Sequence, residues 1–362
     1  MEKIKVGFIG TGMMGREHIK VVFEQFKDVA EVSAICDTNS DELNLAKKLL
    51  PENVKCFSDY RDIINEKDVQ AVFISLPNYL HCEVSIAAMK GGKDVFCEKP
   101  IATKIEDVYR MIEVKEKTGR ILMIGLELRY SEYFQKMKKL VDLEVIGNPV
   151  IAWCKEFRGP FLPKIDNWII KKEMSGGALV DKNSHHFDLM TWFLNAKPIK
   201  VCAFGGKNVL KVLNTEDEIE DNAVVIVEYE NGKRASLSMC MFSPATAGDY
   251  TLEIGLIGDK GRMQTEGDGK AIHIWKREKH EDIRWVGRSP NYIRRSEHIV
   301  YNVPVLEEKW GHWGFLQEHT AFFDAIRTRR IPLTGIENVI YSTIIPIAAE
   351  ESIKTGRVID IK

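Results

Sequence analysis

Two stretches of the chain place titratable side chains where they could carry out acid–base chemistry. The first, Glu98-Lys99-Pro100, follows a predicted strand, and ligands bind at the carboxyl ends of strands in open α/β sheets. In the second, Asp181 and His185 lie four residues apart and share one face of a helix, whereas His186 faces elsewhere and is expected to be structural. Both stretches also allow structural interpretations, as a solvated surface lysine and as a buried helix start.

A glycine-rich turn near the start of the chain has the spacing that holds a dinucleotide. The sequence GTGMMG follows one predicted strand and opens a predicted helix, the context that gives the G-x-G-x-x-G pattern its meaning. Gly10 permits the turn, Gly12 lets the backbone approach a pyrophosphate, and Gly15 lets the helix pack on the strand. The helix start at Met13 and Met14 turns its N–H groups and its dipole toward the phosphates.

An acidic residue lies where such a fold contacts the adenosine ribose. Asp37 ends the next predicted strand, 22 positions after Gly15. A carboxylate at this point accepts hydrogen bonds from the ribose diol and repels a 2′-phosphate. The two signals together predict NAD as the cofactor in preference to NADP, and a doubly wound domain without a dinucleotide is the alternative.

The first part of the chain alternates short apolar runs with helical patterns, which predicts βαβ crossovers and a parallel sheet. Apolar residues occupy consecutive positions, as in Val72-Phe73-Ile74, because helices cover both faces of such a sheet. We therefore predict an α/β domain over residues 1–126, a Rossmann-type, doubly wound parallel sheet. Its predicted strands are 5–10, 32–37, 54–57, 69–76, 94–97 and 121–126.

The rest of the chain, residues 127–362, is predicted to be a substrate-binding and oligomerisation domain of α+β type. Apolar and polar residues alternate along 235–241 and 251–256, and Asn231-Gly232 is a hairpin signal, so the domain should contain a large, mostly antiparallel open sheet. Helical patterns return at 315–328 and 338–355, and Gly356 is placed to end the second. The segment from Ala223 to Trp285 predicts a sheet with one partly uncovered face, and hence a homodimer or homotetramer.

Composition excludes several classes of partner. The formal net charge is −2 and neither sign forms a long run, so nucleic acid is not an expected partner. No segment approaches the roughly 20 apolar residues of a membrane span, and the start lacks a signal-peptide pattern, which predicts no membrane association and a cytoplasmic protein. Seven cysteines are scattered without C-x-x-C spacing, and no cluster has ligand spacing, so neither disulfides nor a metal site are expected.

Taken together, the motifs resemble those of the Gfo/Idh/MocA family, named for glucose-fructose oxidoreductase, inositol dehydrogenase and a rhizopine catabolism protein. The resemblance rests on the glycine turn, Asp37, Pro-Asn-x-x-His at 77–81, Glu-Lys-Pro at 98–100 and Asp-x-x-x-His-x-x-Asp at 181–188, and it covers nearly the whole chain. It implies that Lys99, Asp181 and His185 are catalytic. His185 would exchange the hydroxyl proton, Asp181 would orient the imidazole, and Lys99 would hold the oxygen as its charge develops.

The resemblance also implies cofactor contacts outside the glycine turn. The residues concerned are Ser75, Pro77, Asn78, His81, Glu98, Lys99, Arg129 and Trp168. Pro100 is expected to follow a cis peptide bond, and Ile169 stands where the family often has arginine, which puts a phosphate contact there in doubt. Arg129 could instead serve in packing. Tyr292 and His312 lie in segments that could border the cleft.

We therefore expect an NAD-dependent dehydrogenase or reductase that moves a hydride between NAD and a secondary hydroxyl carbon of a polyol, inositol or sugar-like substrate. One alternative is a redox-neutral enzyme that keeps NAD bound and cleaves or epimerises a sugar. Another is a non-catalytic protein that senses a dinucleotide or a sugar. The presence of Lys99, Asp181 and His185 counts against the sensor, because binding alone needs no acid–base set.

Overall fold

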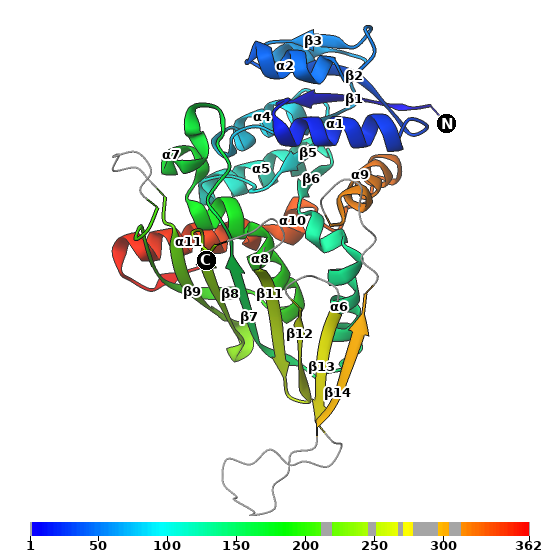
Figure 1. Ribbon diagram of the computed structural model, residues 1–362. Coiled ribbons are helices and arrows are strands. Elements are labelled where there is room, and N and C mark those ends of the chain that lie inside the picture. The colour runs from blue at the N-terminus through cyan, green and yellow to red at the C-terminus, as the bar shows by residue number, and fades with distance from the viewer. Residues whose placement is uncertain are drawn as a thin grey trace, which may run out of the picture.

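The computed structural model describes residues 2–210, 219–244, 251–266, 271–277, 296–303 and 313–361. The predicted positions Trp285, Tyr292 and His312 lie outside these residues. The chain forms an upper domain built on one sheet and a lower domain built on another, stacked one above the other (Figure 1).

The upper domain confirms the doubly wound parallel sheet. Its six strands lie in the order β3-β2-β1-β4-β5-β6 and all pair in parallel. The order reverses between β1 and β4, and ligands of open α/β sheets bind at this switch point. The strands are β1 (Ile4–Ile9), β2 (Ala30–Cys36), β3 (Lys55–Phe57), β4 (Ala71–Ile74), β5 (Asp94–Glu98) and β6 (Leu122–Gly125).

Local signals set the limits of the helices in this domain. The side chain of Asn39 accepts hydrogen bonds from the N–H groups of Asp41 and Glu42 and so caps one helix, while Gly119 ends another at a φ of 62°. The helical segments are α1 (Met13–Gln25), α2 (Ser40–Lys47), α3 (Tyr60–Asn65), η1 (Asn78–Leu80), α4 (His81–Lys90), α5 (Ile105–Thr118) and η2 (Glu127–Tyr130).

The lower domain contains the expected large, mostly antiparallel sheet. Nine strands lie in the order β14-β13-β12-β11-β7-β10-β9-β8-β15, and only β7 and β10 pair in parallel among the described strands. The predicted Asn231-Gly232 turn joins the antiparallel strands β9 and β10. The strands are β7 (Pro149–Phe157), β8 (Pro198–Gly206), β9 (Asn222–Tyr229), β10 (Arg234–Cys240), β11 (Thr251–Gly258), β12 (Gly261–Thr265), β13 (Ala271–Arg277), β14 (Ser296–Asn302) and β15 (Ile359–Asp360).

Helices cover one face of this sheet, and none of the described helices covers the other. α8 packs on β7 and α11 packs on β8. The opposite face carries exposed apolar side chains on neighbouring strands, among them Phe204 at 74% exposed, Val224 and Ile226. The helical segments are α6 (Glu132–Asp142), η3 (Ile165–Ile170), α7 (Lys172–Ser175), α8 (Ala178–Leu194), η4 (Glu230–Gly232), α9 (Phe315–Thr328), α10 (Ile336–Val339) and α11 (Tyr341–Thr355).

Two features of the C-terminal third depart from the expected pattern. The single helix predicted for 338–355 is divided into α10 and α11, although Gly356 ends it as expected at a φ of 67°. More notably, α9 lies beside α1 of the upper domain (Figure 1). The core of the upper sheet includes Phe315, Phe322 and Phe323. The first domain therefore buries side chains that lie about 300 positions after its own first strand in the sequence. The predicted division at residue 126 remains a prediction.

Candidate active site

The glycine turn has the shape that a dinucleotide pyrophosphate needs. Gly10 has a φ of +89°, and a Cβ there would lie 2.3 Å from the carbonyl oxygen of Ser75. A Cβ on Gly15 would lie 2.0 Å from the carbonyl oxygen of Gly10. At Gly12, by contrast, a Cβ would meet nothing within 4 Å, at the start of α1, where no side chain caps the helix. The open space lies where helix N–H groups attract phosphate, so the residues present fit the cofactor.

Asp37 lies beside this turn. Its Oδ2 accepts hydrogen bonds from the N–H of Thr11 at 2.7 Å and the hydroxyl of Thr11 at 3.1 Å, and its Oδ1 accepts from the N–H of Asn39 at 2.8 Å. These bonds fix the carboxylate at the carboxyl edge of β2, next to the glycine loop. The position agrees with the ribose contact predicted from the sequence.

Lys99 leaves the sheet at the same edge, directly after β5, and the Lys99–Pro100 peptide bond is cis, as expected. Glu98 accepts a hydrogen bond from the N–H of Lys99 at 3.1 Å and lies 2.8 Å from Nε2 of His18. Burial would raise the pKa of Glu98, but His18 and Lys99 hold it below its ordinary value. Glu98 is therefore a buried carboxylate that holds the backbone of Lys99 in place.

The second cluster meets the first across the two domains. Nζ of Lys99 donates a hydrogen bond to the backbone carbonyl of Asp181, in the first turn of α8, at 2.7 Å. The carboxylate of Asp181 accepts a hydrogen bond from Nδ2 of Asn78 at 3.1 Å and lies 3.1 Å from Nζ of Lys182. Burial opposes ionisation, yet Lys182 and Lys99 hold the pKa of Asp181 well below its usual range. Asp181 is thus ionised among cations.

His185 lies one turn farther along α8, and the structure pairs it with a residue that the sequence did not single out. Its Nε2 is 3.5 Å from Oε2 of Glu127, the first residue of η2. Burial, followed by the charge of Glu98, raises the pKa of Glu127 to about 8. The family resemblance implied that Asp181 orients His185, but the carboxylate of Asp181 contacts Asn78 and Lys182. One feature of the sequence could have identified Glu127 as a site residue: its carboxyl group comes directly after the predicted strand 121–126.

Like Asn78 and Glu98, two further residues predicted to contact the cofactor are engaged inside the protein. His81 is completely buried, with Nδ1 2.7 Å from the carbonyl of Pro100 and Nε2 2.9 Å from that of Leu76, so it ties two loops together. Arg129 is also buried, and it donates hydrogen bonds to both carboxylate oxygens of Asp188 at 2.6 and 2.8 Å. Cofactor contacts from these two side chains stay predictions that the geometry does not favour.

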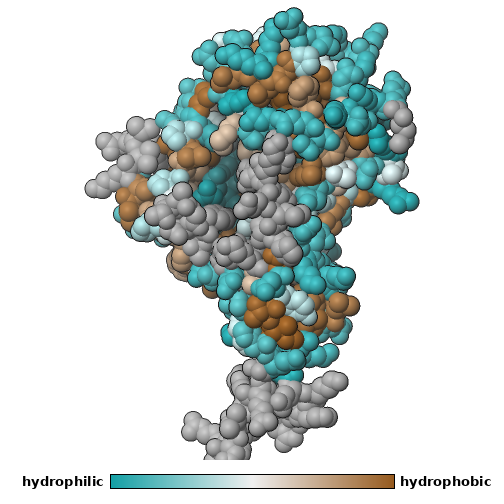
Figure 2. All heavy atoms as spheres, turned by 45° about the vertical axis from the view of Figure 1, so that its right-hand side comes forward, coloured by the Kyte–Doolittle hydropathy of each residue, from teal (hydrophilic) through white to brown (hydrophobic). Residues whose placement is uncertain are grey.

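Three other predicted residues lie at the edge of the upper sheet that carries the glycine turn. Ser75 and Pro77 follow β4 at the switch point, Trp168 is half-buried on η3, and Met13 is 45% exposed at the start of α1. His186, expected to be structural, is buried 3.0 Å from the amide nitrogen of Asn183. Figure 2 shows that the surface is hollowed at the level where the two domains meet, and that hydrophilic residues are visible inside the hollow.

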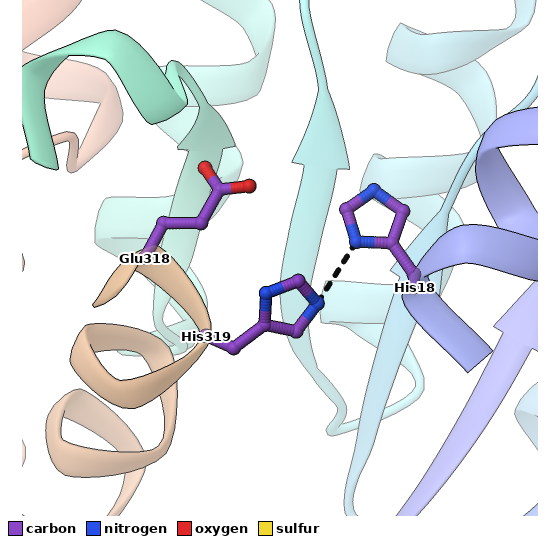
Figure 3. Close-up of side chains that lie close together, drawn as sticks. All are labelled: His18, Glu318 and His319. Carbon is purple, nitrogen blue, oxygen red and sulfur yellow. Dashed lines mark hydrogen bonds between the residues drawn. The ribbon is translucent and has the colours of Figure 1, made fainter. Parts of the chain in front are cut away.

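One group of side chains in the described residues has metal-ligand character. His18 on α1 and Glu318 and His319 on α9 offer ligand atoms within 4.8 Å of one another (Figure 3). The two rings already bond each other, Nδ1 of His18 lying 3.0 Å from Nε2 of His319, and both contact phenylalanine rings, including Phe73 and Phe96. The geometry supports a packing role between α1 and α9, and the expectation of no metal stays a prediction.

Comparison with known proteins agrees with this geometry. A family model described as "Oxidoreductase family, NAD-binding Rossmann fold" matches residues 4–126, and its companion, "Oxidoreductase family, C-terminal alpha/beta domain", matches residues 138–361. The chain belongs to the Gfo/Idh/MocA family. It is an NAD-dependent dehydrogenase acting on CH–OH groups.

Named Gfo/Idh/MocA relatives include inositol dehydrogenases. Myo-inositol 2-dehydrogenase of Thermotoga maritima is 31% identical over 260 residues, covering 72% of this chain and 74% of the relative. Inositol 2-dehydrogenase of Salmonella typhimurium is 29% identical over 264 residues, covering 72% and 73%. The structure of scyllo-inositol dehydrogenase from Lactobacillus casei with bound NAD(H) and scyllo-inositol shares the fold, with a TM-score of 0.78 at 23% identity over 99% of both chains. In the described part of this chain, no helix is long and apolar enough to cross a bilayer.

Proposed function

We propose that this chain oxidises a secondary hydroxyl group of a polyol, such as an inositol or a related sugar, and that NAD accepts the hydride. The observation that carries the proposal is the bond from Nζ of Lys99 to the backbone of Asp181, because it joins the two predicted catalytic clusters at the carboxyl edge of the upper sheet. The names of the inositol dehydrogenases support the class of substrate.

The side chains divide the proton chemistry between them. NAD supplies the hydride acceptor. Lys99 presents a cation to the substrate oxygen and stabilises negative charge as the carbon–hydrogen bond breaks. His185 takes the hydroxyl proton, since an imidazole exchanges protons near neutral pH. Asp181 stays ionised and holds Lys99 and Lys182 at the site.

A substrate screen tests the proposal. The purified protein is mixed with NAD at alkaline pH and with inositols, sugars or sugar acids, and NADH formation is followed by absorbance. We expect a subset of polyols to yield stoichiometric NADH and ketone. Product without net NADH would establish the redox-neutral alternative. Tight binding of NAD without conversion of any compound would establish the sensor.

The open face of the lower sheet supports assembly into a homodimer or homotetramer. Phe204 pairs across strands with Val224, and Ile226 lies next to them, and all three side chains are more than half exposed. A contiguous apolar face of this kind is typical of a protein interface. Light scattering should give a mass of at least twice the 41.4 kDa of one chain, and a monomer at working concentration would contradict the proposal.

A further inference from the structure

Glu127 is the carboxyl group that the fold directs at His185. β6 pairs with β5 so that Gly125 lies opposite Glu98, and Glu127 follows two residues later at the same edge of the sheet. Its Oε2 lies 3.5 Å from Nε2 of His185, and the two side chains are 15% and 11% exposed. Both members of this ionisable pair are therefore largely shielded from bulk water.

The charges around Glu127 make both of its protonation states accessible. Burial raises the pKa of Glu127 to about 8, and the carboxylate of Glu98 on β5 adds to the rise, while Lys99 opposes it. α8 contributes His185, and α9, which packs against η2, carries Glu318. Within η2 itself, the charge of Arg129 is paired with the carboxylate of Asp188. Near neutral pH the carboxylic acid therefore predominates, and the carboxylate predominates above pH 8.

Each state of Glu127 dictates a different form of the imidazole. A carboxylate accepts the hydrogen of Nε2, so the lone pair of neutral His185 lies on Nδ1, where it can take a proton. A carboxylic acid instead donates to Nε2, so the hydrogen of His185 lies on Nδ1, where it can be given to an oxygen. The two forms differ by one proton, and only the first is a base toward the substrate.

We propose that Glu127 is a positioning residue that sets the proton-accepting or proton-donating form of His185, and so the pH ranges in which oxidation and reduction each run fastest. The inference rests on the proposed function. In oxidation, the hydroxyl proton moves to Nδ1 of His185, the proton of Nε2 moves to the carboxylate of Glu127, and the hydride goes to NAD. In reduction, the acid form of Glu127 returns its proton to Nε2 as Nδ1 protonates the carbonyl oxygen.

The first test compares pH profiles. Glu127→Gln keeps the shape of the side chain and can donate or accept, but it does not titrate. For one group titrating near pH 8, turnover in polyol oxidation should rise about tenfold between pH 7 and pH 9 in the wild type, and less than about threefold in Glu127→Gln. Glu132→Gln is the matched control, because Glu132 is exposed on α6, and it should keep the wild-type profile. A full tenfold rise in Glu127→Gln would overturn the proposal.

The second test needs no turnover. The ring nitrogens of His185 are followed by NMR of protein labelled with ¹⁵N-histidine, and the signal is assigned by its loss in His185→Asn. We expect the wild-type signal to show an inflexion near pH 8 that vanishes in Glu127→Gln. A wild-type titration curve without this inflexion would refute the role of Glu127. If the inflexion is present but no polyol is oxidised, the proposed function fails and the coupling of Glu127 to His185 stands.

Discussion

The buried pair of Arg129 and Asp188 allows a quantitative prediction about stability. Its two hydrogen bonds measure 2.6 and 2.8 Å, and the side chains are 5% and 2% exposed. Asp188→Asn keeps the shape of the side chain but removes its charge, which leaves the guanidinium buried without a counterion. Breaking one side of such a pair costs about 3 to 5 kcal/mol in the free energy of unfolding. That is a large part of the roughly 5 to 15 kcal/mol by which folded proteins are stable.

Replacing both charged residues should destabilise the protein less than replacing Asp188 alone. Burial raises the pKa of Asp188 although Arg129 opposes the rise, so desolvating this carboxylate costs more than the attraction returns. The double variant Arg129→Met with Asp188→Leu removes both desolvation costs, and it should recover most of the stability lost in Asp188→Asn.

Urea unfolding followed by tryptophan fluorescence measures both effects. With a slope near 3 kcal/mol per molar, Asp188→Asn should lower the midpoint by about 1 M or more. Glu113→Gln is the control, because its ion pair with Lys117 is exposed, and it should leave the midpoint unchanged. The reasoning is refuted if Asp188→Asn unfolds with the wild-type midpoint, or if the double variant is less stable than Asp188→Asn.

The remaining predictions concern the cofactor, the chemistry and the metal. Asp37→Ser should weaken NAD relative to NADP by about tenfold or more, since it removes a charged acceptor, and unchanged preference in a fluorescence titration would contradict the ribose contact. Lys99→Ala and His185→Ala should each lower turnover by about 10² to 10⁴ while NAD binding survives, and near wild-type rates would show that the chemistry lies elsewhere. Elemental analysis should find no stoichiometric metal, and a metal lost in His319→Gln would instead identify the His18 and His319 pair as ligands.

Local patterns were sufficient for the sheet and the glycine turn, whereas the cis bond before Pro100 was expected only from the family resemblance. Strand, turn and helix follow one another along the sequence there, and each glycine is required by its immediate neighbours. The contact between Arg129 and Asp188 joins residues 59 positions apart, and that between His18 and His319 spans 301. The periodicity of a helix predicts which of its faces is apolar, but it does not predict which segment of the chain packs on that face. The partner of His185 escaped the sequence analysis for the same reason, because it depends on how two domains meet.

The packing of α9 against α1 has a consequence for how the chain is made. The first sheet is complete once residue 125 has been synthesised, yet its core still lacks Phe315, Phe322 and Phe323. Ribosomes add about 5 to 20 residues per second, so these side chains arrive roughly 10 to 40 s later. Throughout that interval a nascent upper domain exposes the rings of Phe26, Phe73 and Phe96 that α9 will cover. This surface is where a chaperone on the ribosome would find its substrate, and where truncated chains ending before α9 would aggregate.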